Sequence, residues 1–95
     1  METNNLIQIE HFCVNCDVEV SFINSLNEYG LIDVIILEEK KYISHEQLKD
    51  VEKAIRFYYE LNINMEGIDV IFNLLKQISV LQQELKTATD RINLF

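Results

Sequence analysis

The residues of this 95-residue chain that most suggest chemistry are two cysteines in a C-x-x-C spacing. Cys13 and Cys16 enclose two residues, and His11 lies two residues before the pair. Such thiols are typical of half a zinc site or of a redox pair. A structural zinc ion needs four ligands, however, and the sequence has no further cysteine and one further histidine, His45. Helical spacing places Cys13 on an apolar face, so we predict that Cys13 is a buried apolar residue, that Cys16 is partly exposed, and that the chain holds no metal.

The remaining polar groups do not form a catalytic arrangement. Glu38 and Glu39 are adjacent carboxylates, but a general acid–base pair needs a cleft, and the polar run at residues 38–41 indicates a solvated turn. His45 precedes a predicted helix, with no acid–Ser or acid–Cys arrangement beside it. The sequence also contains no phosphate-binding glycine loop, HExxH or nucleophile elbow. It therefore predicts a protein that is not an enzyme, with no catalytic residue and no cofactor.

The charge of the chain is distributed unevenly. Residues 1–39 hold eight acids and no Lys or Arg, whereas residues 40–95 hold eight acids and eight bases, so the net charge of −8 belongs to the first segment. We call residues 1–39 the acidic segment. Because affinity for nucleic acid depends on Lys and Arg that neutralise phosphates, this segment is a poor nucleic-acid surface. The N-terminus has no signal-peptide pattern, and residues 34–37 are the longest fully apolar run, so we expect a cytoplasmic protein without a membrane span.

The elements that position these residues are expected to be mainly helical, because the chain has no Pro and two Gly. Apolar residues at spacings of three and four predict a helix over residues 9–16. Asp17 ends that helix and is a candidate cap for the next one. A second helix buries Phe22, Ile23 and Leu26 and ends at Gly30 in a left-handed position. Two short helices around a tight turn predict a helix-turn-helix.

A small β wing and a third helix follow. Residues 34–36 and 42–43 are rich in β-branched and aromatic types, which favours a hairpin. Residues 44–47 (SHEQ) match a capping box that would open the third helix. The apolar stripe of this helix is Leu48, Val51, Ile55 and Tyr58, with Leu61 or Asn62 at its end. Tyr59 is predicted to be more exposed than Tyr58, and an exposed tyrosine of this kind either anchors a partner or is merely partly buried. Asn64 is the predicted N-cap of the last helix.

The last helix carries a heptad pattern. Its spacings of 3-4-3-4-3-4-3 define a candidate dimer seam: Ile71, Leu74, Ile78, Leu81, Leu85, Ala88, Ile92 and Phe95. We expect residues 68–78 to pack on the domain, and residues from about Leu81 to project and associate with a second copy, because an isolated helix is marginal in water. The pattern leaves open whether that homodimer is parallel or antiparallel. The chain is thus predicted to be one domain, with an acidic winged helix-turn-helix region and its following helix over residues 1–63 and the long helix over residues 64–95.

This order of elements resembles the MerR-type winged-helix architecture. Within that group, the chain resembles the chaperone-modulator CbpM family over residues 6–95. The resemblance is carried by residues 9–13 (IEHFC), 29–32 (YGLI), 55–61 (IRFYYEL) and 65–68 (MEGI), and by the heptad helix. It implies a mainly α fold with a small wing. It also implies a modulator that binds and inhibits the J domain of a DnaJ-like, CbpA-type co-chaperone and blocks its use by Hsp70, with a buried Cys in the first helix.

The alternative is a MerR-type DNA-binding transcriptional regulator, since the two functions share one fold. MerR-type DNA binders carry an Arg and a Tyr in the second helix and an Arg-x-Tyr in the wing, whereas this chain has Asn24 and Ser25 in that helix and Lys40 and Lys41 in the wing. We therefore favour a basic protein surface as the partner. The candidate contacts are the acids Glu19, Glu28, Asp33, Glu38 and Glu39. A third hypothesis is a small-ligand sensor with an aromatic cavity near Phe57, Tyr58 and Phe72.

Overall fold

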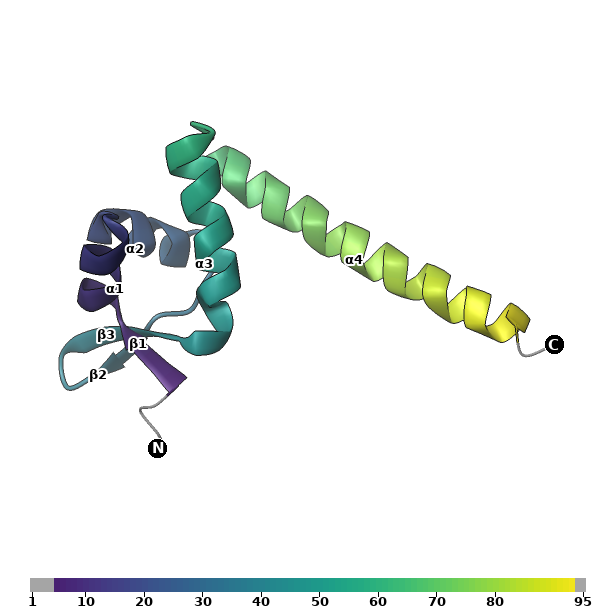
Figure 1. The fold of residues 1–95 in the computed structure, drawn as a ribbon, viewed down its shortest axis with the longest axis horizontal. Coiled ribbons are helices and arrows are strands. Elements are labelled where there is room, and N and C mark those ends of the chain that lie inside the picture. Colours follow the sequence, from purple (N-terminus) through teal and green to yellow (C-terminus); the bar gives the residue numbers. More distant parts are fainter. Residues whose placement is uncertain (1–4, 94–95) are drawn as a thin grey trace.

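The computed structural model describes residues 5–93 as a small helical head from which one long helix extends (Figure 1). The elements in chain order are β1 (Leu6–Gln8), α1 (Ile9–Cys16), α2 (Val20–Glu28), β2 (Ile35–Leu37), β3 (Lys40–Ser44), the 3₁₀ turn η2 (His45–Gln47), α3 (Leu48–Ile55), the π-helical turn η3 (Arg56–Glu60) and α4 (Met65–Asn93). The predicted mainly α fold with a helix-turn-helix and a small wing is confirmed.

The turn between α1 and α2 follows from one left-handed residue. Asp17 has φ 55°, and the backbone N–H of Val18 donates to the Cys13 carbonyl at 2.9 Å, which closes the end of α1. Asn and Asp enter this conformation more readily than other non-glycine residues. The prediction that Asp17 also caps α2 is wrong, because Glu19 immediately precedes α2 and makes no side-chain capping bond. The chain reverses here at the left-handed Asp17, without a side-chain cap on α2.

The end of α2 is a Schellman motif. Gly30 has φ 74°, its N–H donates to the Asn27 carbonyl at 3.0 Å, and the Leu31 N–H donates to the Leu26 carbonyl at 2.9 Å. These two bonds satisfy carbonyls that the end of a helix leaves without partners, and they need a left-handed residue that only glycine supplies without strain. The predicted end of the second helix is confirmed.

The wing is part of a three-stranded antiparallel sheet in the order β1-β3-β2. Between β1 and β3, Ile7 lies opposite Ile43. In the hairpin of β2 and β3, Leu37 lies opposite Lys40, so Glu38 and Glu39 alone form the turn. The predicted polar turn is therefore shorter than residues 38–41, because Lys40 already belongs to β3. Strand β1 was not predicted. Its three residues are too few to show an alternating pattern in the sequence. They form a strand because they pair with the free edge of β3.

The predicted capping box at residues 44–47 is wrong. Ser44 makes no side-chain capping bond, and the first turn of the helical segment is the 3₁₀ turn η2. Instead, the Gln47 side chain reaches back to the backbone of Asp33: its Oε1 accepts the Asp33 N–H at 2.6 Å, and its Nε2 donates to the Asp33 carbonyl at 2.9 Å. This amide pair ties the segment between α2 and the wing to the start of α3.

The core lies where α1, α2, α3 and the sheet meet. It consists of Ile9, Phe12, Cys13, Val18, Phe22, Ile23, Leu26, Ile32, Ile43, Val51, Ala54 and Ile68. Ala54 was missing from the predicted stripe of the third helix, because a small residue gives little periodic signal. Leu61, predicted as the end of that stripe, is 61% exposed, since the chain leaves the helix at Asn62 with φ 56°.

Helix α4 begins as predicted and then leaves the head. The Asn64 Oδ1 accepts the N–H of Gly67 at 2.8 Å, which is an N-cap bond. A Cβ at Gly67 would lie 2.7 Å from the Ile63 Cγ2, so any larger residue at this position would displace the Ile63 side chain. Ile68 is fully buried, but Leu74 is already 51% exposed. The contact with the head therefore ends near residue 72, not near residue 78 as predicted, and the rest of α4 projects as a rod (Figure 1).

This projection sets the shape of the molecule. The radius of gyration is 16.8 Å and the extents are 56 × 37 × 21 Å. A compact chain of this length has a radius of gyration of about 12 Å. The 29-residue helix α4 spans about 43 Å by its rise per residue, which accounts for the excess. Helices α1 and α2 and the wing lie together at one end, and the C-terminal end of α4 lies at the other (Figure 1).

Candidate functional site

The five candidate acids all lie on the helix-turn-helix and the wing, and all are exposed. Glu19 immediately precedes α2, Glu28 is its last residue, Asp33 lies in the segment after it, and Glu38 and Glu39 form the tip of the wing. The structure brings the last two together and distributes the other three along and after α2. The acidic segment thus provides the helix-turn-helix and the first strand and tip of the wing, and its described residues include no Lys or Arg, whereas the second strand of the wing begins with the exposed Lys40 and Lys41.

The tip of the wing carries acids at two strained positions. Glu38 has φ 50° and Glu39 has φ 67°, and a two-residue hairpin with φ above zero at both residues is a type I′ turn. Asn-Gly is the sequence that this turn prefers, because a side chain in the left-handed region costs about 1–3 kcal/mol. The turn alone would favour other residues than two glutamates at these positions.

A hydrogen bond and a cluster of aromatic rings join the start of α2 to the turn η3. The backbone N–H of Glu19 donates to the Tyr59 hydroxyl at 3.4 Å, across forty residues of sequence. Phe22 packs against both tyrosines of η3, with ring centroids 4.8 Å from Tyr58 and 5.4 Å from Tyr59. The predicted difference in exposure between the tyrosines is wrong: Tyr58 is 40% and Tyr59 41% exposed. The π-helical turn, closed by the Leu61 N–H on the Arg56 carbonyl at 3.1 Å, presents both rings to α2.

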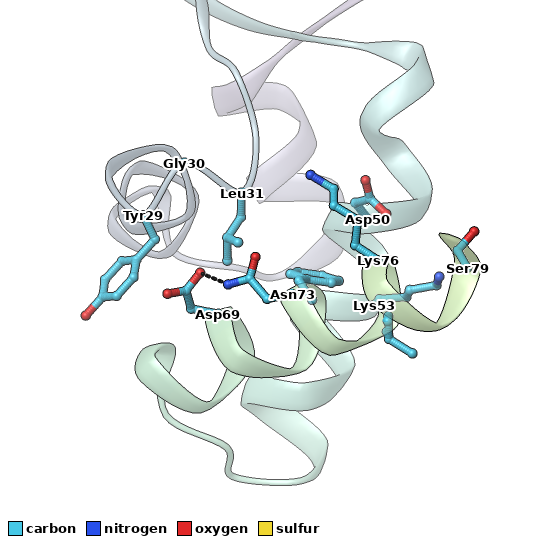
Figure 2. A pocket seen from close by; sticks show the side chains of 11 residues that line it. Tyr29, Gly30, Leu31, Asp50, Lys53, Asp69, Asn73, Lys76 and Ser79 are labelled. Atoms are coloured by element: carbon cyan, nitrogen blue, oxygen red, sulfur yellow. Dashed lines mark hydrogen bonds between the residues drawn. The ribbon is translucent and has the colours of Figure 1, made fainter. Parts of the chain in front are cut away.

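A cleft of about 380 Å³ lies between the turn after α2 and the helices α3 and α4 (Figure 2). Its charged lining is balanced, with Asp50 and Lys53 on α3 and Asp69 and Lys76 on α4. Of the three aromatic residues expected to form a ligand cavity, only Phe72 lines it. Phe57 instead packs against Phe72 at a centroid distance of 6.1 Å, and Tyr58 lies against α2. The aromatic ligand cavity of the third hypothesis is therefore not formed by the residues proposed for it.

Beside this cleft, one hydrogen bond joins α4 to the end of α2. The Tyr29 hydroxyl donates to the Glu66 Oε1 at 2.9 Å. A hydrogen bond from its own backbone N–H, in the first turn of α4, and the one from Tyr29 lower the pKa of Glu66 below its usual value. The same bond raises the pKa of Tyr29. The bond connects the end of α2 to the first turn of α4, near the junction of α4 with the head.

The candidate dimer seam lies along the projecting part of α4. Ile71 is half-buried at the edge of the head, and the seam residues from Leu74 to Ile92 are exposed in the single chain. Leu85 is 68% and Ile92 73% exposed. Phe95, the last predicted seam residue, lies outside the described residues. An apolar stripe of this length on one face of a helix is the pattern of a surface that packs against another helix.

The two cysteines differ as predicted, since Cys13 is buried and Cys16 is exposed, and both are free thiols. Burial raises the pKa of Cys13, and the neighbouring Cys16 raises it further, which makes Cys13 a poor nucleophile. Within residues 5–93, no three His, Cys, Asp or Glu side chains are placed so that they could hold a metal ion. No helix in the same part of the chain combines the length and the hydropathy needed to cross a membrane.

Comparison with known families identifies the class of the protein. The family model described as MerR HTH family regulatory protein matches residues 7–89. The chain therefore belongs to the MerR helix-turn-helix family of regulatory proteins. Comparison with curated proteins and with solved structures gives no significant match.

Three features of the candidate site escaped the sequence analysis. The Gln47–Asp33 amide pair, the Glu19–Tyr59 bond and the packing of both tyrosines on Phe22 each join residues at least 14 positions apart. No local signal reports such contacts. The one local signal of the aromatic packing was the run of three aromatic residues at residues 57–59. From the sequence, Tyr58 was expected on the apolar stripe of the third helix and Tyr59 in a more exposed position.

Proposed function

We propose that this chain is a non-enzymatic regulator that binds a basic protein surface through its acidic helix-turn-helix and wing. We further propose that the partner is the J domain of a DnaJ-like, CbpA-type co-chaperone, which the chain inhibits by competing with Hsp70. The observation that carries the proposal is that the elements with which a helix-turn-helix regulator contacts its target contain acids and no Lys or Arg until Lys40.

Electrostatics separate a protein partner from DNA. A duplex carries a phosphate charge on every nucleotide and would be repelled by the exposed carboxylates at the two ends of α2, while the two lysines at the start of β3 are offset by the two glutamates of the wing tip. A J domain presents a positive helix face to Hsp70, as the resemblance to CbpM implies, and an acidic module that covers this face gains association rate and orientation from charge complementarity. The strained glutamates at the tip of the wing support the same conclusion, because they keep carboxylates where Asn-Gly would fit better.

The test is a titration of an isotopically labelled J domain with the full chain at two salt concentrations. We expect signals of the positive helix to shift, and the affinity to fall as salt rises. Replacing the wing-tip pair by Glu38→Gln and Glu39→Gln should weaken binding about 2- to 30-fold, since exposed charge contacts contribute about 0.2–1 kcal/mol each. The matched control neutralises two acids far from the head, Glu84→Gln and Asp90→Asn on α4, and should leave the affinity unchanged.

Three results would contradict the proposal: unchanged J-domain signals, binding that does not respond to salt, or an equal loss of affinity in the control variant. A gel shift with duplex DNA at low salt provides the opposite test. The helix-turn-helix of the MerR family makes DNA the second candidate target. A retarded duplex would favour a transcriptional regulator, whose basic contacts would then have to come from residues 40–95.

We also propose that the chain is a homodimer joined along α4. The seam residues from Leu74 to Ile92 remain exposed in the single chain, and burying one Leu or Ile contributes about 1.5–3 kcal/mol. Sedimentation at tens of micromolar should therefore give a dimer. Leu85→Glu, which places a charge in the seam, should dissociate it, whereas Gln83→Glu, which adds the same charge on another face of α4, should not. A monomeric chain with its natural sequence would refute the seam.

A further inference from the structure

A small hollow opens at the start of α2, where this helix faces the turn η3 and the start of α4. It has a volume of about 220 Å³. The lining residues are Glu19, Ser21, Phe22, Ser25, Tyr58, Asn64 and Met65. We call it the aromatic hollow. Its lining places it beside the first turn of α2, and it shares no residue with the wing or with the cleft between α3 and α4.

The rings at the aromatic hollow form one rigid cluster. Phe22 is 4% exposed, and its ring packs against the ring of Tyr58, with 4.8 Å between the centroids and 40° between the planes. Tyr59 meets Tyr58 edge-on, at 5.0 Å and 76°. Tyr58 is thus held on two sides while 40% of its surface stays exposed. An aromatic ring fixed in this way offers its electron-rich face to a cation at little further cost in entropy.

The charge at the aromatic hollow has one sign. Glu19 lies on its rim, and the Ser21 Oγ donates to the Glu19 Oε2 at 3.3 Å, which orients the carboxylate. The bond from the Glu19 N–H to the Tyr59 hydroxyl holds the backbone of the same residue against the aromatic cluster. None of the described residues that line the aromatic hollow is a Lys or Arg. An oriented carboxylate beside an aromatic face, without a cation of the chain itself, is a receptor for a cation from elsewhere.

We propose that the aromatic hollow binds the guanidinium group of an arginine side chain presented by the protein partner. Arginine fits better than lysine, because the planar guanidinium stacks on an aromatic face while its N–H groups donate to a carboxylate. The guanidinium would lie on Tyr58 and donate to Glu19, and the hydroxyls of Ser21 and Ser25 line the remainder of the space. Association needs no covalent step.

The proposal deepens the proposed function and rests on it for the identity of the partner, since it names the group that a basic surface would insert. Its chemistry can be tested without that partner. The probe is N-acetyl-arginine amide, and the matched neutral probe is N-acetyl-citrulline amide, which has nearly the same shape. We expect saturable shifts of the Tyr58 and Phe22 ring signals in NMR spectra with the arginine probe and none with the citrulline probe. N-acetyl-lysine amide should bind more weakly than the arginine probe.

Two pairs of variants keep the test specific. Glu19→Gln should weaken binding of the arginine probe about 1.4- to 5-fold, the effect of losing one exposed charge contact, whereas Glu28→Gln, at the other end of α2, should not change it. Tyr58→Leu should abolish the saturable shifts of Phe22, and the conservative Tyr58→Phe should retain them. Backbone amide spectra show whether each variant keeps the fold.

The outcomes separate the two proposals. Equal shifts with the arginine and citrulline probes, or equal effects of Glu19→Gln and Glu28→Gln, would overturn the arginine site even if the J domain binds. Binding of the arginine probe together with no binding of the J domain would refute the J-domain function and leave the aromatic hollow as an arginine site for another partner.

Discussion

The Gln47 side chain provides the sharpest test of how the head is held together. Residues 44–47 match the pattern of a capping box, in which the Ser44 side chain would accept a backbone N–H at the start of the helix. The structure instead uses Gln47 to bind the N–H and the carbonyl of Asp33, with bonds of 2.6 and 2.9 Å. The two arrangements predict opposite orders of stability for the variants Ser44→Ala and Gln47→Ala.

The magnitudes follow from the bonds that each variant removes. Gln47→Ala removes two hydrogen bonds, each with a net contribution of about 0.5–1.5 kcal/mol, so the free energy of unfolding should fall by about 1–3 kcal/mol. For a chain of this size that lowers the Tm by about 4–8 °C per kcal/mol. Ser44→Ala removes no side-chain capping bond and should cost less than about 0.5 kcal/mol, whereas a true cap would cost about 1 kcal/mol.

The assay is denaturant unfolding followed by circular dichroism, with all variants at one protein concentration because association shifts apparent stability. Gln83→Ala on the exposed part of α4 is the control for loss of a glutamine, and it should change the midpoint little. Gln47→Glu keeps an acceptor for the Asp33 N–H but loses the donor to the carbonyl, so it should be less stable than the natural chain. If Ser44→Ala destabilises the chain as much as Gln47→Ala, the reasoning from the structure is refuted.

Three further predictions follow from the wing, the core and the junction of α4. Glu38→Asn with Glu39→Gly should stabilise the chain by about 1 kcal/mol or more in thermal unfolding, because Asn-Gly relieves the left-handed strain; lower stability would contradict the type I′ turn. Ile68→Ala should cost about 2–5 kcal/mol, since Ile68 is fully buried where α4 meets the head; a loss under 1 kcal/mol would mean that this contact is loose. The folded-state pKa of Glu66 is lowered, so its ionised form stabilises the fold above the unfolded-state pKa, and that contribution is lost as the pH falls through the folded-state pKa. Tyr29→Phe should therefore raise the pKa of Glu66 in an NMR titration and reduce the acid sensitivity, and an unchanged pKa would show that the bond does not form in solution.

Much of the fold could be predicted because its signals are local. The ends of the helices at Asp17 and Gly30 and the N-cap at Asn64 depend on backbone conformations and capping bonds within a few residues. The spacing of apolar residues located both short helices and the apolar stripe of α4. The acidic segment is also evident from sequence alone, because charge is a property of residue types and needs no fold to be counted.

The contacts that build the candidate site required the tertiary structure. Strand β1 exists because β3 offers it an edge to pair with. The Gln47 side chain bonds to the backbone of Asp33 and does not cap the helix, because the fold brings Gln47 and Asp33 within 3 Å of each other. Capping boxes and strand patterns compete with such distant partners, and sequence spacing cannot decide between them.

The acids of the acidic segment show both what the sequence determines and what the tertiary structure decides. The sequence by itself determined that residues 1–39 have eight acids and no Lys or Arg, and it predicted a helix-turn-helix within this segment. Only the tertiary structure decided that Glu19 lies beside the rings of Tyr58 and Phe22, and that Glu38 and Glu39 take strained positions. The physical reason is that charge is additive along a chain, whereas a binding site depends on distances between residues that the sequence separates.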